Sequence, residues 1–113
     1  MKEQVKDLWV AALRSGEYKQ TQTVLHDGDG YCCLGVLCRV LGKQFAPAYT
    51  NHERAVYLCE GSTVLLPRVV RDEAGMKSDS GAFGVARSLA DLNDKGVPFD
   101  EIASLISEHW ETL

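Results

Sequence analysis

The fold of this protein depends on one apolar stretch, Tyr31-Cys32-Cys33-Leu34-Gly35-Val36-Leu37-Cys38-Arg39-Val40-Leu41. A helix with this sequence is apolar on nearly every side, so other elements have to cover it on several sides. Asp29 stands where the N-cap of this helix is expected, and Gly42 ends the helix. Gly35 in its middle costs about 1 kcal/mol in helix propensity, which predicts that another backbone packs closely there. We expect this helix at the centre of the fold.

Two longer amphipathic helices flank the central stretch, because apolar residues recur there at the 3.6-residue period. The first ends at Ser15-Gly16, and its apolar face consists of Val5, Leu8, Trp9, Ala12 and Leu13. The last begins at Pro98, and its apolar face consists of Phe99, Ile102, Ala103, Ile106 and Trp110. Shorter helical pieces are predicted at 67–74, stopped by Gly75, and at 88–93.

The remaining segments predict a small antiparallel sheet. Residues 18–25 are rich in β-branched and aromatic side chains and precede a turn at 27–30. Residues 55–66 predict a β-hairpin with its turn at 60–62, and residues 43–53 form a connector. We therefore predict an α+β fold, a small single domain over residues 1–113 with three main helices packed on a small antiparallel sheet.

The composition is that of an ordinary globular chain of 113 residues, with 45% hydrophobic and 25% charged residues. Lys and Arg total 12 against 16 for Asp and Glu, so the net charge of −4 disfavours long nucleic acid. A small anionic ligand is still allowed, because screening leaves only charges within roughly 8 to 10 Å effective. The charged N-terminus lacks a secretory signal and no apolar run reaches the roughly 20 residues of a membrane span. We expect a cytoplasmic protein with reduced cysteines and no membrane partner.

The four cysteines do not have the spacing of a zinc site. A helix turns Cys32 and Cys33 apart by about 100° and places Cys38 a further one and a half turns along. We interpret these three and Cys59 as core thiols and expect no metal and no other cofactor. Residues 27–30 resemble the start of a calcium loop, but the twelfth position of that loop is Cys38 where a glutamate is required.

The sequence contains no constellation that dictates a chemistry. His26, His52 and His109 lie near polar loop or helix-end residues, and we expect them on the surface. Because the sequence places no thiol or hydroxyl beside an oriented base, we predict no catalytic residue. A small hydrolase that uses a cysteine or paired carboxylates stays open as an alternative.

Two polar turns are candidate ligand sites. The turn at 15–20 carries Tyr18 and Lys19, and an aromatic ring beside a long cation can bind a base and a phosphate together. The same composition also suits a plain connector with an exposed lysine. For residues 93–96 we prefer the interpretation as a plain turn over the interpretation as a ligand site.

The stretch from Tyr31 to Cys38 resembles the core of a widespread family of small proteins encoded by tailed bacteriophages. The similarity extends to Trp9-x-x-Ala12-Leu13-x-Ser15-Gly16-x-Tyr18-x-Gln20, Leu66-Pro67-x-x-Val70-Arg71 and Leu89-x-x-Leu92-Asn93-Asp94-x-Gly96-x-x-Phe99-x-Glu101-Ile102-Ala103. The chain departs from the family pattern at Pro98, where a capping serine is expected, which puts only the capping of the last helix in doubt. Small phage proteins of this size often act against host defences, and one such group sequesters cyclic nucleotide immune signals without cleaving them. The resemblance implies a role of this kind in the host cytoplasm.

We therefore predict capture of a small nucleotide signal, a cyclic oligonucleotide, without catalysis. The candidate stacking ring is Tyr18, and the candidate base or ribose partners are Asn93 and Asp94. The candidate phosphate-binding cations are Arg14, Lys19, Arg68 and Arg71. The alternatives are a protein-binding inhibitor of a host defence enzyme and a small hydrolase. A chain this short buries little by itself, so we also predict self-association through Trp110 and Leu113 at the end of the last helix.

Overall fold

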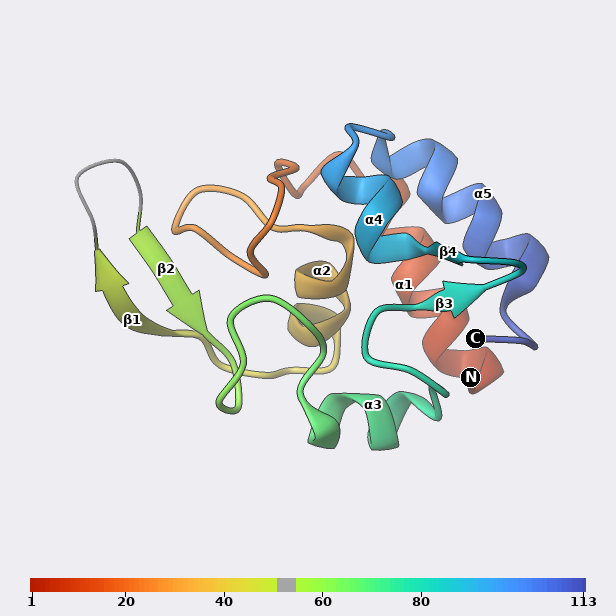
Figure 1. Cartoon of the computed structure of the whole chain (residues 1–113), viewed down its shortest axis with the longest axis horizontal. Helices are drawn as coiled ribbons and strands as arrows, with labels where there is room; N and C mark the ends of the chain where they lie inside the picture. Colours follow the sequence, from red (N-terminus) through yellow and green to blue (C-terminus); the bar gives the residue numbers. More distant parts are fainter. Residues whose placement is uncertain (51–54) are drawn as a thin grey trace.

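The computed structural model describes residues 1–50 and 55–113, and it confirms an α+β fold (Figure 1). In chain order the elements are α1 (Glu3–Arg14), α2 (Cys33–Val40), β1 (Ala46–Thr50), β2 (Ala55–Leu58), α3 (Arg68–Ala74), β3 (Ala82–Phe83), β4 (Arg87–Ser88), α4 (Leu89–Asp94) and α5 (Phe99–His109). No helix of the described residues is long and apolar enough to cross a membrane.

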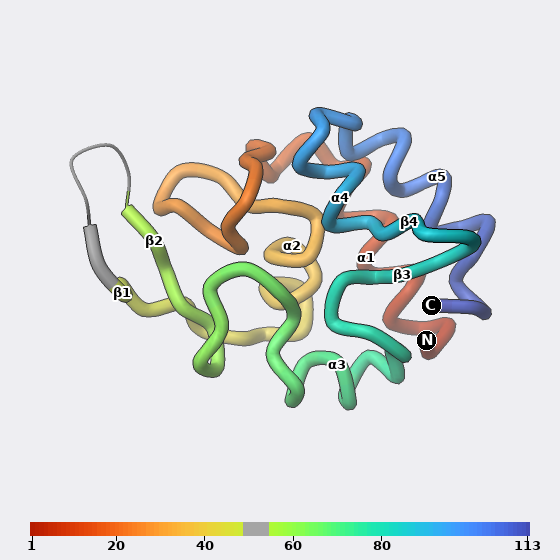
Figure 2. Tube along the Cα trace, viewed as in Figure 1, coloured from red at the N-terminus to blue at the C-terminus, as the bar shows by residue number. Residues whose placement is uncertain are grey.

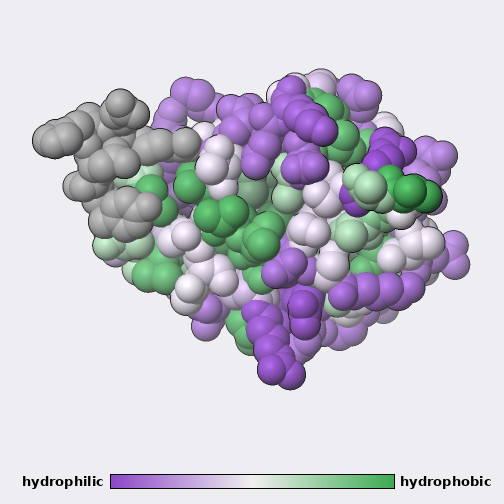
Figure 3. Space-filling view, in the orientation of Figure 1, coloured by the Kyte–Doolittle hydropathy of each residue, from purple (hydrophilic) through white to green (hydrophobic). Residues whose placement is uncertain are grey.

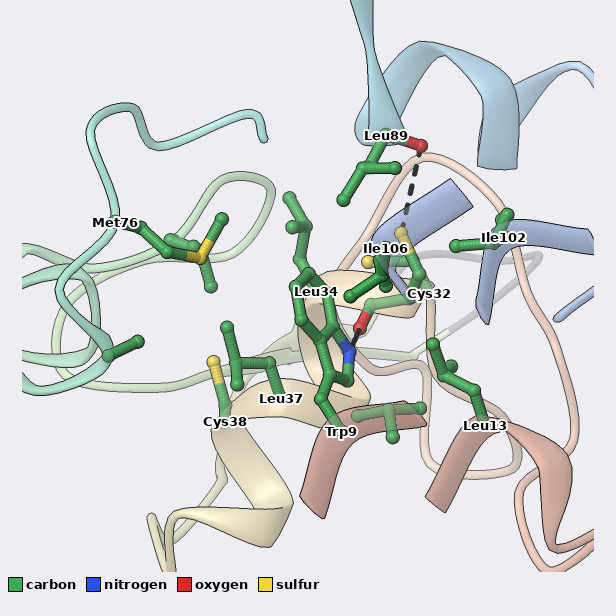
Figure 4. Packing of buried hydrophobic residues seen from close by; sticks show 14 of the residues in the cluster. Trp9, Leu13, Cys32, Leu34, Leu37, Cys38, Met76, Leu89, Ile102 and Ile106 are labelled. Carbon is green, nitrogen blue, oxygen red and sulfur yellow. Dashed lines mark hydrogen bonds between the residues drawn. The ribbon is translucent and has the colours of Figure 1, made fainter. Parts of the chain in front are cut away.

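Helix α2 lies at the centre of the core, as the sequence predicts. All six residues from Cys33 to Cys38 are buried. Trp9 of α1 packs against this helix, and its indole Nε1 donates a 2.9 Å hydrogen bond to the carbonyl oxygen of Cys33 (Figure 4). The close backbone approach predicted at Gly35 is confirmed, because a Cβ there would overlap the carbonyl oxygen of Leu25. The chain around Leu25 therefore closes one side of α2.

Helices α1 and α5 lie side by side and cover other parts of the core (Figures 1 and 2). The predicted inward face of α5 is confirmed except at Trp110, which follows the helix and is half-buried. On α1 the prediction is wrong for Leu8, whose exposed fraction is 54%, while Val10 is buried. Leu113 is only 1% exposed, which leaves no apolar chain end of the kind predicted for self-association.

The positions of the strands differ from the prediction. Residues 18–25 form no strand, and only isolated bridges join Gln20 and His26 to Tyr31. Strand β2 pairs with the preceding β1, inside the predicted connector, and 63–66 contains no strand. The chain does turn at 60–62, where Cys59 pairs with Ser62. Beyond that turn the carbonyl of Thr63 accepts the N–H of Leu25, so residues 63–66 do not return along β2. The helices therefore pack mainly on one another, and the β1–β2 hairpin projects from one end (Figure 1).

Helix α2 begins later than predicted, and Asp29 is not its cap. The N-cap is Cys32, which makes no side-chain capping bond. Asp27 instead orders the preceding turn, because its Oδ1 accepts the N–H groups of Asp29 at 2.9 Å and Gly30 at 2.7 Å. Pro98 is the N-cap of α5 and makes no side-chain capping bond.

The turn between β3 and β4 contains a strained residue. Ala86 has φ +54°, the left-handed region that disfavours every residue with a Cβ. We expect Ala86→Gly to stabilise the protein by about 0.5 to 1 kcal/mol, since glycine adopts this conformation without the steric cost. The midpoint of urea unfolding measures the change. Ala82→Gly, at an exposed position of β3 with no such strain, is the matched control and is expected to lower stability.

Candidate ligand-binding face

Five rings from separate segments meet beside the β1–β2 hairpin, and we call them the aromatic cluster. His26 stacks on Tyr31 with 4.0 Å between ring centroids and 10° between ring planes. Tyr18 meets the edge of Tyr31 at 5.5 Å, and Phe45 and Tyr57 approach His26 at 5.2 Å and 4.8 Å. His26 is 9% exposed, whereas the other four rings are half-buried. The cluster therefore offers partly open aromatic surface around a buried imidazole.

Backbone hydrogen bonds hold these rings in place. The N–H of Tyr31 donates to the carbonyl of Lys19 at 2.8 Å, and the N–H of Thr21 donates to the carbonyl of Tyr31 at 2.9 Å. The N–H of Tyr57 donates to the carbonyl of His26 at 3.0 Å, which ties β2 to the same loop. The ring of His26 is fixed by a 2.8 Å hydrogen bond from Nδ1 to the carbonyl of Gly30, which requires the proton on Nδ1. The loop before α2 is thus a shaped platform, although it has no regular secondary structure.

A cation lies next to the cluster. The ammonium of Lys19 pairs with the carboxylate of Asp29 at 2.6 Å, and both side chains are about 70% exposed. The hydrogen bond from Lys19 to Asp29 raises the pKa of this lysine, so it is charged throughout the physiological range. Because the pair is in water, an anionic ligand can compete for the ammonium at small cost. Arg14, at the end of α1, is exposed and donates a 3.2 Å hydrogen bond to Ser104 of α5.

Asn93, predicted as a base or ribose contact, has a structural role in this fold. Its side chain is fully buried. Oδ1 accepts hydrogen bonds from Nε2 of Gln20 at 2.9 Å and from the N–H of Cys33 at 3.1 Å, and Nδ2 donates to the carbonyl of Thr21 at 2.8 Å. The neighbouring Asp94 is exposed, and its Oδ1 accepts the N–H of Thr23 at 2.7 Å. Together they anchor the loop between α1 and α2 onto α4.

Arg68 and Arg71 do not join the other predicted residues. They belong to α3, whose last residue, Ala74, accepts the N–H of Lys2 just before α1 begins. Arg14 is at the opposite end of α1, and twelve helical residues span about 18 Å. The length of α1 therefore separates α3 from Arg14 in a single copy of the protein, and Figure 1 shows α3 near the start of α1.

The cysteines are core thiols, as predicted. All four are free and buried. Burial raises the pKa of the Cys32 thiol to about 11 and raises the pKa values of Cys33, Cys38 and Cys59 as well. These thiols stay protonated near neutral pH, which makes them poor nucleophiles. Within residues 1–50 and 55–113, no group of three or more His, Cys, Asp or Glu side chains is placed to hold a metal ion.

Two of the histidines depart from the surface positions predicted for them. His26 is buried in the aromatic cluster, and His109 is half-buried with its ring 5.0 Å from that of Phe83. The remaining prediction, for His52, lies outside the described residues. His26, Tyr31, Phe45 and Tyr57 are the cluster members that sequence reasoning missed, and the only available signal was the density of aromatic residues between 18 and 57. The described part of the chain forms no enclosed pocket beside them.

The fold and this face define a small α+β domain with an open aromatic platform and buried, unreactive thiols. The chain belongs to the family described as "Domain of unknown function (DUF8296)", whose model matches residues 1–110. No curated protein and no solved structure matches the chain.

Proposed function

We propose that the protein binds a small nucleotide signal of the cyclic oligonucleotide type on the aromatic cluster and holds it without cleaving it. The observation that carries this proposal is the set of half-buried rings next to the exposed ammonium of Lys19. Tyr18 belongs to this set, and its half-buried ring meets the edge of Tyr31. In the setting we propose, the protein is encoded by a bacteriophage and acts in the host cytoplasm against a defence signal.

The free energies favour a ligand with several bases. Stacking contributes about 1 to 3 kcal/mol per base, and a charge-assisted hydrogen bond contributes about 1.5 to 3 kcal/mol. Nanomolar affinity corresponds to about −12 kcal/mol, which one base and one phosphate do not reach. A cyclic oligonucleotide presents two or more of each, so tight capture on an open face needs aromatic clusters from two copies of the protein.

Capture without cleavage is supported by the state of the thiols. Their raised pKa values and burial remove the nucleophile on which a cysteine hydrolase would depend. The nearby His26 has its Nδ1 engaged with the carbonyl of Gly30 and stacks on Tyr31, so it is a packing residue in this arrangement.

Calorimetry of the purified protein against cyclic dinucleotides and trinucleotides tests the proposal. We expect Tyr18→Ala and Lys19→Gln each to weaken binding by about tenfold, the equivalent of one stacked base or one phosphate contact. Arg39→Gln, an exposed cation on α2, is the matched control and is expected to leave affinity unchanged.

Three outcomes would count against this assignment in different ways. No binding across the panel removes the capture function. A linearised or hydrolysed nucleotide, recovered after heating the complex, converts the protein into an enzyme. Full affinity in both Tyr18→Ala and Lys19→Gln moves the site away from the aromatic cluster.

A further inference from the structure

The exposed apolar side chains of the protein are concentrated beside α3. Among the described residues, the large hydrophobic side chains that are exposed are Leu8, Val64, Leu65, Val69 and Val85. Three of these five fall within six consecutive residues, at the end of the loop from β2 and in the first turn of α3. Figure 3 shows apolar side chains gathered on the face that carries this loop. We call Val64, Leu65, Arg68, Val69 and Asp72 the α3 patch.

The charges in the α3 patch form a loose ion pair with each other. Arg68 and Asp72 are 87% and 66% exposed, and Nε of Arg68 is 3.8 Å from Oδ2 of Asp72. Because this exposed pair is too long for a hydrogen bond and contributes little, both groups can exchange it for a closer partner at small cost. Positions 68, 72 and 69 lie within about 100° of the helix circumference, and along the helix axis Val69 comes between Arg68 and Asp72.

We propose that the α3 patch binds the same patch of a second copy of this chain, with the two α3 helices antiparallel about a twofold axis. A twofold axis requires a self-complementary surface. The order cation, valine, anion along α3 meets that requirement, because reversal of the helix places Arg68 opposite the partner's Asp72 and Asp72 opposite the partner's Arg68. The two valines then lie near the axis and lose their contact with water.

The other surfaces considered for self-association are closed. Leu113 is buried, which removes the chain end. The outer edge of β1 is interrupted at Pro47, the register partner of Tyr57. The N–H of Tyr57 points away from β1, toward His26. In an antiparallel pair the opposite residue, Pro47, then also turns its backbone outward, and proline has no N–H to donate to another strand there.

The pairing through α3 is independent of ligand capture. The α3 patch shares no residue with the aromatic cluster, so the two proposals rest on different side chains. We expect a weak, concentration-dependent dimer, because the α3 patch has far fewer residues than the roughly 20 to 30 that a stable interface uses on each partner. Failure of the α3 pair would leave the ligand proposal intact.

Sedimentation velocity over a range of concentrations, without nucleotide, tests the pair. The wild type is expected to dimerise with concentration and Val69→Glu to stay monomeric. Arg68→Asp and Asp72→Arg are each expected to raise the dissociation constant about tenfold, and the double variant Arg68→Asp/Asp72→Arg to restore it. Val85→Glu, at a side chain 90% exposed on the β3–β4 turn, is the matched control and should dimerise normally. Circular dichroism verifies that each variant is folded.

A wild type that is monomeric at every concentration would overturn the proposal. So would a double variant whose dissociation constant is as high as that of the single variants. The protein could also stay monomeric but bind a host protein, and lose that binding in Val69→Glu. The α3 patch would then be the binding surface of a protein-binding inhibitor, and the proposed pairing with a second copy would be wrong.

Discussion

Gly35→Ala is expected to be the most destabilising single substitution in the core of this protein. The new Cβ would overlap the carbonyl oxygen of Leu25 and lie 2.9 Å from its carbonyl carbon. Leu25 has no room to retreat, because its side chain is fully buried and its N–H donates to the carbonyl of Thr63 at 2.8 Å. The same Leu25 carbonyl accepts the N–H of Cys32 at 3.2 Å. We expect a loss of more than about 3 kcal/mol, a large part of the usual 5 to 15 kcal/mol.

Urea unfolding followed by circular dichroism measures this effect. Gly16→Ala is the matched control, since Gly16 has φ +78° but no atom within 4 Å of an added Cβ. It tests the cost of backbone conformation alone, which is about 1 kcal/mol. If Gly35→Ala is no more damaging than Gly16→Ala, α2 is not packed against the Leu25 backbone as described.

Replacement of Asn93 is expected to be the second most damaging change. Asn93→Ala removes three hydrogen bonds at once and leaves the N–H of Cys33 and the carbonyl of Thr21 without this buried partner. An unsatisfied buried polar group costs about 1 to 3 kcal/mol, so a total loss of about 3 kcal/mol or more is expected. Asn93→Asp keeps the acceptor for Gln20 and Cys33 but sets a carboxylate against the Thr21 carbonyl. It is expected to be destabilising near neutral pH and less so in acid, where the protonated carboxyl can donate.

Asp94→Asn is the control for Asn93, because its exposed side chain retains an oxygen that accepts the N–H of Thr23. We expect a change within about 0.5 kcal/mol, measured by thermal unfolding. An Asn93→Ala variant with normal stability would contradict the structural role of this residue.

The helices were predictable because their signals are local. Gly75 stops α3 with φ +71°, and α5 begins after Pro98, so short-range rules apply to both ends. The strands were not predictable in the same way. The segments 18–25 and 63–66 have strand-like composition, but a strand forms only where a partner is available in register. Here the partner of β2 is β1, from the proline-containing segment that the sequence predicted as a connector.

The candidate site shows the same division. Tyr18 and Lys19 stood out because an aromatic and a cation are adjacent in a polar turn. The buried position of Asn93 was hidden, because a turn sequence does not reveal which of its amides another loop will enclose. Tyr31 belongs to the apolar stretch predicted as the central helix. Because α2 begins only at Cys33, the ring of Tyr31 meets His26 instead.

By itself, the sequence determined that this protein is a small α+β domain built around one apolar helix with a glycine at its closest backbone contact. These features follow from residue periodicity, side-chain volume and backbone freedom, which act over a few residues. Only the tertiary structure decided that rings from positions 18 to 57 meet in one cluster, that Asn93 is enclosed and that α3 carries an exposed patch. Each of these depends on contacts between distant segments, whose free energies are realised only when the whole core is assembled.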